Sequence, residues 1–187
     1  MDTRETLIDH AIGIVRKVGY AGFSYADLSD AVGIRKASIH HHFPAKGDLG
    51  LAIVETYRVT FTEELGTIRH AEASGAKRLK RYAGLYREAL RTGSGCLCGV
   101  LAAEFANLPK PVQAAVRAFF AENTDWLAGV LLEMADASGH RRSQKAAQQS
   151  AQMILAGFQG ALLSARAQND IEVFDATVAT VIAAVIH

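Results

Sequence analysis

Apolar residues recur every three to four positions along most of the chain, which is the spacing of amphipathic helices. The first such face consists of Ile8, Ala11, Ile12, Val15 and Val18. No segment alternates apolar and polar residues as a half-buried strand would, and proline occurs only at positions 44, 109 and 111. The pattern therefore predicts an all-α protein.

Helix start and stop signals divide this pattern into about nine helices. Asp2 with Glu5 has the spacing of a capping box, and Ser24 is a cap with an acid three residues later. Pro44 ends a helix, because the residue before proline disfavours the α region. The expected helices run from Asp2 to Gly19, from Ser24 to Gly33, and over residues 36–43, 46–70, 76–92, 97–107, 110–137, 142–168 and 171–186.

The second and third of these helices have the arrangement of a helix-turn-helix. Both are short, and a turn containing Gly33 joins them behind a longer first helix. In such units the second helix enters the major groove of DNA. Ile39 and Phe43 lie four residues apart and face inward, so the other side chains of residues 36–43 point outward.

Positive charge in this region is local, because the 187-residue chain has a net charge of only +1. From Arg35 to Lys46 there are three cations and no acid, together with Ser38 and the histidines at 40–42. Lysine and arginine neutralise phosphates, whereas serine and histidine hydrogen-bond base edges or phosphate oxygens. We therefore expect DNA contacts on and beside the third helix.

Residues 19–49, GYAGFSYADLSDAVGIRKASIHHHFPAKGDL, resemble the DNA-binding signature of the tetracycline-repressor (TetR) family. The resemblance implies a helix-turn-helix domain over residues 1–46, a ligand-sensing and dimerisation domain over 47–187, and a homodimer on a double-stranded DNA operator. It also implies that residues 36–43 are the recognition helix. The expected DNA-binding residues are Ser24, Arg35, Lys36, Ala37, Ser38, His40, His41 and Lys46.

Two positions depart from the family pattern. The family commonly has serine or threonine at the position of Arg35 and tyrosine at that of His40. The first change removes a side-chain cap worth about 1 kcal/mol, which a phosphate contact of Arg35 could offset. The second replaces an aromatic hydroxyl with a titratable ring, so the family's base preference does not carry over.

The three adjacent histidines at 40–42 are not expected to bind a metal ion. Successive helical residues point about 100° apart, so these rings cannot share one ion. No further ligand lies three or four residues away. We expect neither a metal nor a cofactor.

Aromatic and other bulky apolar residues recur in the middle helices, where helical proteins build small-molecule pockets. Each of them can also be simply core. Polar groups that could accompany a ligand are Tyr82, Tyr86, Glu104, Asn123 and Gln159. The family resemblance implies a small-molecule inducer at this place. The expected pocket residues are Phe61, Tyr82, Tyr86, Leu101, Phe105, Phe119, Trp126 and Phe158.

The last helix carries more apolar surface than a chain end needs to cover its own core. A stripe of small residues on the eighth helix permits close helix approach, and the ninth helix has an apolar face. We expect both in a four-helix dimer interface, the alternative being a terminal helix that closes a monomer. The expected interface residues are Gly157, Gly160, Ser164, Val178, Val181, Ile182 and Val185.

Cys96 and Cys98 follow a glycine loop and lie near a helix start, where the helix dipole lowers the pKa of a thiol. They could form an oxidant or electrophile sensor, although two buried small hydrophobes are the commoner case. A basic run in the fifth helix is expected to be a solvated face paired with neighbouring acids. This run contains Lys77, Arg78, Lys80, Arg81, Arg87 and Arg91.

These patterns together predict a ligand-responsive transcriptional regulator. An enzyme is not expected, since no G-x-S-x-G is present and the glycines at 93, 95 and 99 have the wrong spacing for a nucleotide loop. The alternatives are a cysteine-based redox-sensing repressor and a helical protein-interaction adaptor that does not bind DNA. No basic-then-apolar leader or membrane-length apolar stretch occurs, so we expect a cytoplasmic protein away from membranes.

Overall fold

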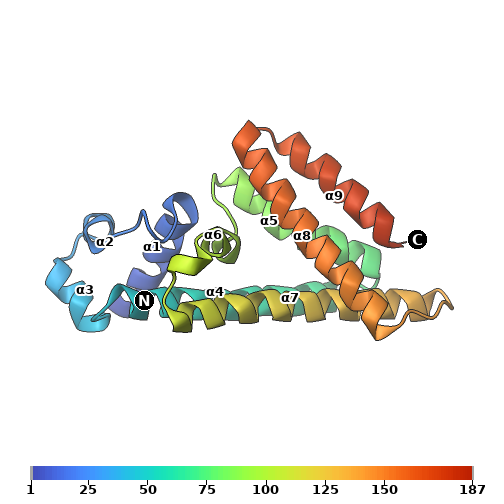
Figure 1. Cartoon of the computed structure of the whole chain (residues 1–187), viewed down its shortest axis with the longest axis horizontal. Helices are drawn as coiled ribbons and strands as arrows, with labels where there is room; N and C mark the ends of the chain where they lie inside the picture. Colours follow the sequence, from blue (N-terminus) through green and yellow to red (C-terminus); the bar gives the residue numbers. More distant parts are fainter. Residues whose placement is uncertain (1, 187) are drawn as a thin grey trace. The chain divides into compact units, whose positions relative to one another are not determined.

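The computed structural model describes residues 2–186, so Met1 and His187, at the outer ends of the two expected domains, lie outside it. Within these residues the chain forms nine α-helices and one 3-10 turn and no strand, which confirms the all-α prediction (Figure 1). The elements are α1 (Thr3–Val18), α2 (Tyr25–Val32), α3 (Lys36–His42), α4 (Lys46–Ala71), α5 (Gly75–Arg91), α6 (Leu97–Ala103), η1 (Phe105–Asn107), α7 (Lys110–Ala137), α8 (Gln144–Gln168) and α9 (Ile171–Ile186).

Most expected helix ends lie within two residues of the observed ones, but the helix expected over residues 97–107 is divided. α6 ends at Ala103, and Glu104 adopts φ −106° and ψ 16° before the short turn η1. The expected start of α8 at 142 moves to Gln144, because Ser143 caps it by accepting a hydrogen bond from the Ala146 N–H.

The helices pack into two compact units. The first unit contains residues up to Phe61 and Cys96–Phe119, and the second contains Thr62–Gly95 and the residues from Phe120 onward. α4 and α7 each contribute residues to both units. These two units are defined by packing, whereas the boundary expected at residue 46 separates DNA binding from ligand sensing. The packing units therefore do not test that boundary, which stays a prediction.

The core of the first unit is built from the apolar stripes of its short helices. Leu28 of α2 and Ile39 of α3 are fully buried, and Phe43, just after α3, is almost fully buried. Val18, expected on the inner face of α1, is instead 56% exposed. It is the last residue of that helix, and Gly19 with φ 83° turns the chain away immediately after it. The buried residues of α1 are Leu7, Ile8, Ala11 and Val15.

In the second unit α8 and α9 lie side by side as an antiparallel pair (Figure 1). Asn169 in the left-handed conformation ends α8 and lets the chain reverse. The two helices approach closely at Gly157, where a Cβ atom would lie 2.8 Å from a methyl carbon of Val181. α5 packs against both. In residues 2–186 we find no helix with the length and apolar character needed to cross a membrane.

Candidate functional site

The start of α2 is fixed by a reciprocal capping arrangement between Ser24 and Asp27. The Ser24 hydroxyl oxygen accepts hydrogen bonds from the Ala26 and Asp27 N–H groups, at 3.2 and 3.4 Å. The Ser24 hydroxyl and N–H both donate to the Asp27 carboxylate, at 2.7 and 2.8 Å. These hydrogen bonds lower the pKa of Asp27. Ser24 is exposed, as a phosphate contact requires, but its hydroxyl proton already has an acceptor.

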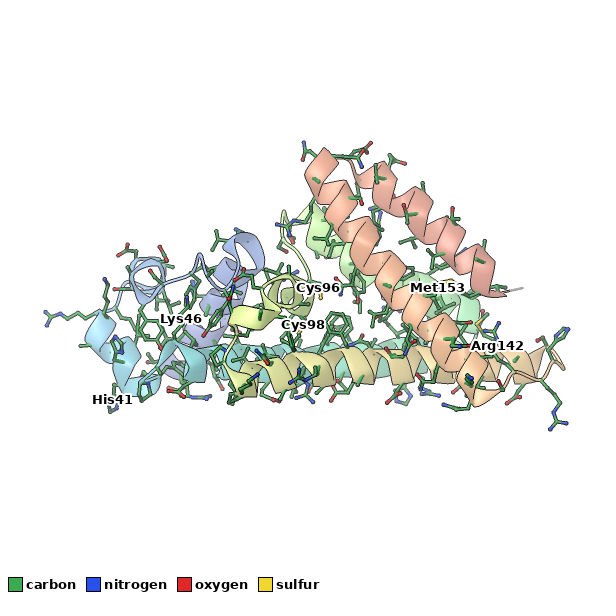
Figure 2. The ribbon with its side chains drawn as sticks, viewed as in Figure 1. His41, Lys46, Cys96, Cys98, Arg142 and Met153 are labelled. Atoms are coloured by element: carbon green, nitrogen blue, oxygen red, sulfur yellow. The ribbon has the colours of Figure 1, made fainter. Side chains whose placement is uncertain are left out.

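α3 presents an exposed face that contains no carboxylate. Arg35 occupies the cap position and its side chain makes no capping hydrogen bond there, as expected from the sequence. Ile39 faces the core, whereas His41 projects away from the helices behind it (Figure 2). The exposed residues of the predicted recognition face are Arg35, Lys36, Ala37, Ser38, His40 and His41.

The His40 ring is held in place by the residues around it. It packs edge-on against Tyr25, with ring centres 4.8 Å apart, and its Nδ1 lies 3.3 Å from the Pro44 carbonyl oxygen. Tyr25 in turn donates a hydrogen bond to the Phe43 carbonyl oxygen, and burial together with Asp48 raises its pKa to about 12. Tyr25 was not predicted as part of this face. It holds the ring of His40, the residue at the position where the family commonly has tyrosine.

Lys46, labelled in Figure 2, begins α4 and lies over two aromatic rings. Its Nζ is 4.6 Å from the centre of the Tyr20 ring and 5.5 Å from that of Phe23. Burial lowers the pKa of Lys46, and the negative charges of Glu104 and Asp27 act in the opposite direction. The Lys46 side chain is half-buried. Contact with a phosphate would therefore require the side chain to move away from the Tyr20 and Phe23 rings, or the phosphate to approach the ammonium group beside them.

Four of the eight residues expected to line a pocket form one aromatic cluster in the second unit. Tyr82 stacks on Trp126 with ring centres 5.5 Å apart and contacts Phe158 at 5.9 Å. The Tyr82 hydroxyl donates to Asn123 Oδ1 at 3.0 Å, and its oxygen lies 3.0 Å from the hydroxyl of Tyr86. We call Tyr82, Tyr86, Trp126 and Phe158 the aromatic cluster.

Two buried donors, one in the aromatic cluster and one on the residue that follows Phe158 in α8, have no hydrogen-bond partner among the described residues. They are Trp126 Nε1 and Gln159 Nε2. A buried N–H without a partner costs free energy that a suitable acceptor would recover. Gln159 was among the polar groups expected near a ligand, and the indole nitrogen of Trp126 was not singled out.

The other four expected pocket residues belong to the first unit. Phe61 and Phe119 pack together with ring centres 5.1 Å apart, and Leu101 is fully buried. The half-buried Phe105 ring lies in η1 with the Arg117 guanidinium 4.9 Å above it. The sequence predicted the bulky residues but not their division between two units, because that depends on contacts between distant segments.

Glu104 lies in a different place from the one expected. It was considered a polar group near a ligand, but its carboxylate accepts hydrogen bonds from the Tyr20 N–H at 3.1 Å and the Ala21 N–H at 2.7 Å. These bonds join residues more than 80 positions apart in the sequence. No local signal announces such a contact.

Two family models match this chain. The model for bacterial regulatory proteins of the tetR family matches residues 7–53, and that for the tetracyclin repressor-like C-terminal domain matches residues 75–181. The chain belongs to the TetR family. The resemblance seen in residues 19–49 is thereby confirmed, and the chain is a DNA-binding transcriptional regulator. Members of this family bind DNA operators as dimers and bind small molecules.

Of three similar proteins, two match most of this chain and one matches about a third of it. A TetR-family transcriptional regulator from Agrobacterium tumefaciens is 35% identical, with a TM-score of 0.88 over 96% of this chain and 95% of the other. The HTH-type transcriptional repressor DhaR of Mycobacterium sp. (strain GP1) is 24% identical over 92% of this chain and 86% of DhaR. The HTH-type transcriptional regulator CymR of Pseudomonas putida is 43% identical over 34% of this chain and 31% of CymR.

The residues expected in a TetR dimer interface differ in their surroundings. Gly160 and Ser164 are exposed on α8, and a Cβ at Gly160 would meet nothing within 4 Å. Gly157 instead contacts Val181 of the same chain. The side chains of Val178, Ile182 and Val185 are buried, and the first two also line a groove of about 420 Å³ between α5 and α9.

Large apolar side chains are nevertheless exposed on α8. Met153, labelled in Figure 2, is 46% exposed, and Leu163 is 54% exposed. Neither was among the expected interface residues. The more conspicuous apolar stripes of α8 and α9 pack this chain against itself.

Cys96 and Cys98, labelled in Figure 2, form no disulfide among the described residues and are buried, with 3% and 0% of their surfaces exposed. The Tyr57 hydroxyl donates to Cys96 Sγ at 3.7 Å. Burial and the neighbouring thiol raise the pKa of Tyr57 well above its usual value. The burial agrees with the simpler interpretation of the two thiols as small core residues.

The basic run of α5 forms ion pairs, as expected for a solvated face. The acids come from several elements, and most of the charged groups are exposed. The pairs are Arg78 with Glu133, Arg81 with Glu72, Arg87 with Asp175 and Arg91 with Glu88. Among residues 2–186, no three metal-ligating side chains converge on one point.

Proposed function

We propose that this TetR-family regulator is a repressor that binds a palindromic operator as a homodimer and is released by a small-molecule inducer. The exposed, carboxylate-free face of α3 is the observation that carries the DNA-binding part. DhaR, which is named as a transcriptional repressor and is similar along most of this chain, supports the direction of the response. The protein would act by binding and not by catalysis, in the cytoplasm where its operator lies.

The proposed DNA contacts follow from what α3 exposes. Arg35 and Lys36 would neutralise phosphates, while Ser38, His40 and His41 would reach base edges. In a dimer the two recognition helices would enter successive major grooves, roughly 34 Å apart. Ser24 and Lys46 would add phosphate contacts after exchanging their present partners within the protein.

The proposed dimer interface is the outward face of α8 and α9. Met153 and Leu163 expose apolar surface there, and Gly160 and Ser164 leave room for a partner helix. Two helices from each subunit would form a four-helix contact, which fits the twofold symmetry of most homodimers. Val178, Val181, Ile182 and Val185 would then support this interface mainly from within the subunit.

The proposed inducer is an apolar molecule with hydrogen-bond acceptors, held at the aromatic cluster. Tyr82, Trp126 and Phe158 supply ring surface, and Trp126 Nε1 supplies a buried donor that has no partner among residues 2–186. Gln159, which follows Phe158 in α8, would supply a second such donor. To change operator binding it needs only about 1 to 3 kcal/mol of differential affinity for the two states. α4 would transmit the change, since it begins at Lys46 and runs through residue 71.

Selection of duplexes from a random DNA library on the full-length protein tests the DNA-binding part. We expect a palindrome whose affinity falls steeply with salt. Arg35→Ala should weaken binding to it about tenfold and reduce the salt slope by about 1, because one phosphate contact is lost.

Arg141→Ala removes the same charge from the loop between α7 and α8 and serves as the matched control. It should leave both the affinity and the salt slope unchanged. Recovery of no palindrome, or equal losses in the two variants, would contradict the proposal.

A further inference from the structure

Glu104 forms a two-bond polar contact between distant segments of the first unit. Its two carboxylate oxygens accept separate hydrogen bonds, Oε1 from the Tyr20 N–H and Oε2 from the Ala21 N–H. Both N–H groups belong to the loop that connects α1 to α2, the first helix of the helix-turn-helix. Hydrogen bonds to an ionised acceptor are stronger than those between neutral groups.

The loop is shaped to receive this carboxylate. Gly19 adopts φ 83°, a backbone conformation that other residues rarely take. A Cβ atom at Gly19 would also collide with the Glu104 carboxylate. Glycine is therefore required here both for the turn and for the space that the carboxylate fills.

The same carboxylate acts on the start of α4. Its charge raises the pKa of Lys46, against the effect of burial. The ring of Tyr20, whose N–H binds Glu104, lies beneath the Lys46 ammonium. One acidic side chain at the end of α6 thus meets the α1–α2 loop and acts on the first residue of α4.

We infer that Glu104 is a positioning residue that fixes the helix-turn-helix to α6 and to the start of α4. Fixing it in this way sets the distance between the two recognition helices of a dimer, and so the operator spacing that the dimer accepts. This inference rests on the proposed function, since it requires a dimer on a palindrome. The residue that sets the spacing preference would thus lie away from the DNA.

Glu104→Gln tests the inference, because glutamine keeps the size of the side chain while its Nε2 cannot accept a hydrogen bond. The probes are the selected palindrome, two duplexes with the half-sites one base pair closer or farther apart, and a single half-site. We expect the affinity of the variant for the palindrome to fall about tenfold, and its discrimination between spacings to fall by a similar factor. Affinity for the half-site should stay unchanged, which a merely destabilised protein would not show.

Glu63→Gln, an exposed acid of α4, removes the same charge and should behave as the parent protein. If Glu104→Gln does not fold, Glu104→Asp retains the charge but is too short to reach both N–H groups, and should show the same relaxed spacing. Unchanged spacing discrimination in a folded variant would overturn the inference. A parent protein that shows no spacing preference would instead contradict the proposed function.

Discussion

Two side chains expected to bind phosphate, Ser24 and Lys46, already have partners within the protein. The Ser24 hydroxyl donates to Asp27, and the Lys46 ammonium lies over Tyr20 and Phe23. Any contact of either residue with DNA replaces an existing interaction. The net gain is therefore smaller than that of Arg35 or Lys36, whose exposed side chains carry their charge on the open face of α3.

The capping pair of α2 should make stability depend on pH. The folded-state pKa of Asp27 is lowered, so its contribution is present at pH 7 and is lost as the pH falls through that pKa, below 3.8. Thermal unfolding should show that Asp27→Asn is less stable than the parent at pH 7. The difference should vanish at a pH below the folded-state pKa of Asp27, where the carboxylate of the parent is protonated.

Ser24→Ala provides the control for this prediction, at a cost of about 1 kcal/mol for the lost cap. Since both changes affect the hydrogen bond from the Ser24 hydroxyl to the Asp27 carboxylate, the double variant should be less destabilised than the sum of the two. Strict additivity would show that the two residues do not stabilise the cap together.

The two thiols should react slowly in the folded protein, because Cys96 and Cys98 are buried. An aromatic disulfide reagent releases a coloured thiolate when it reacts with a cysteine. We expect the folded protein to release it at least about tenfold more slowly than the protein in denaturant, since reaction requires exposure of the cysteine thiolate. Cys96→Ser and Cys98→Ser assign the signal to one thiol or the other. Rapid native reaction that disappears in one variant would restore the sensor interpretation for that residue.

At the scale of the helix, small residues decide how closely α8 and α9 approach. Gly157→Ala should destabilise the protein by about 1 to 2 kcal/mol, because its new Cβ meets Val181 and that clash outweighs the gain in helix propensity. Gly84→Ala, in α5 where a Cβ meets nothing within 4 Å, should be neutral or stabilising. Denaturant unfolding of the two variants at one protein concentration measures both changes in stability. Equal changes would show that the close approach of α8 and α9 at Gly157 does not limit stability.

The helices themselves could be predicted because their ends carry local signals. Ser24, Gly33 and Pro44 act on residues within four positions, so the limits of α2 and α3 followed directly. The exposed face of α3 followed too, since the burial of Ile39 and Phe43 fixes the orientation of that helix. Contacts such as that of Glu104 with the α1–α2 loop could not, because they depend on packing between segments far apart in the chain.

For the whole molecule, the outward face of α8 should control assembly. Leu163→Glu places a charge where we propose a partner helix, so we expect sedimentation to show monomers at concentrations where the parent is a dimer. Val59→Glu, at an exposed apolar position of α4, is the matched control and should remain dimeric. A dimeric Leu163→Glu protein would move the interface to another surface.

Trp126 is the only tryptophan in the chain, and its indole stacks on Tyr82 with a buried nitrogen that has no hydrogen-bond partner within the part of the chain that the structure describes. All tryptophan fluorescence of the protein therefore comes from the place where we propose the inducer binds. An acceptor that reaches the indole nitrogen changes the polarity around an emitting ring, and so changes its spectrum. Compound libraries can then be screened by intrinsic emission on the unlabelled protein, before its operator is known.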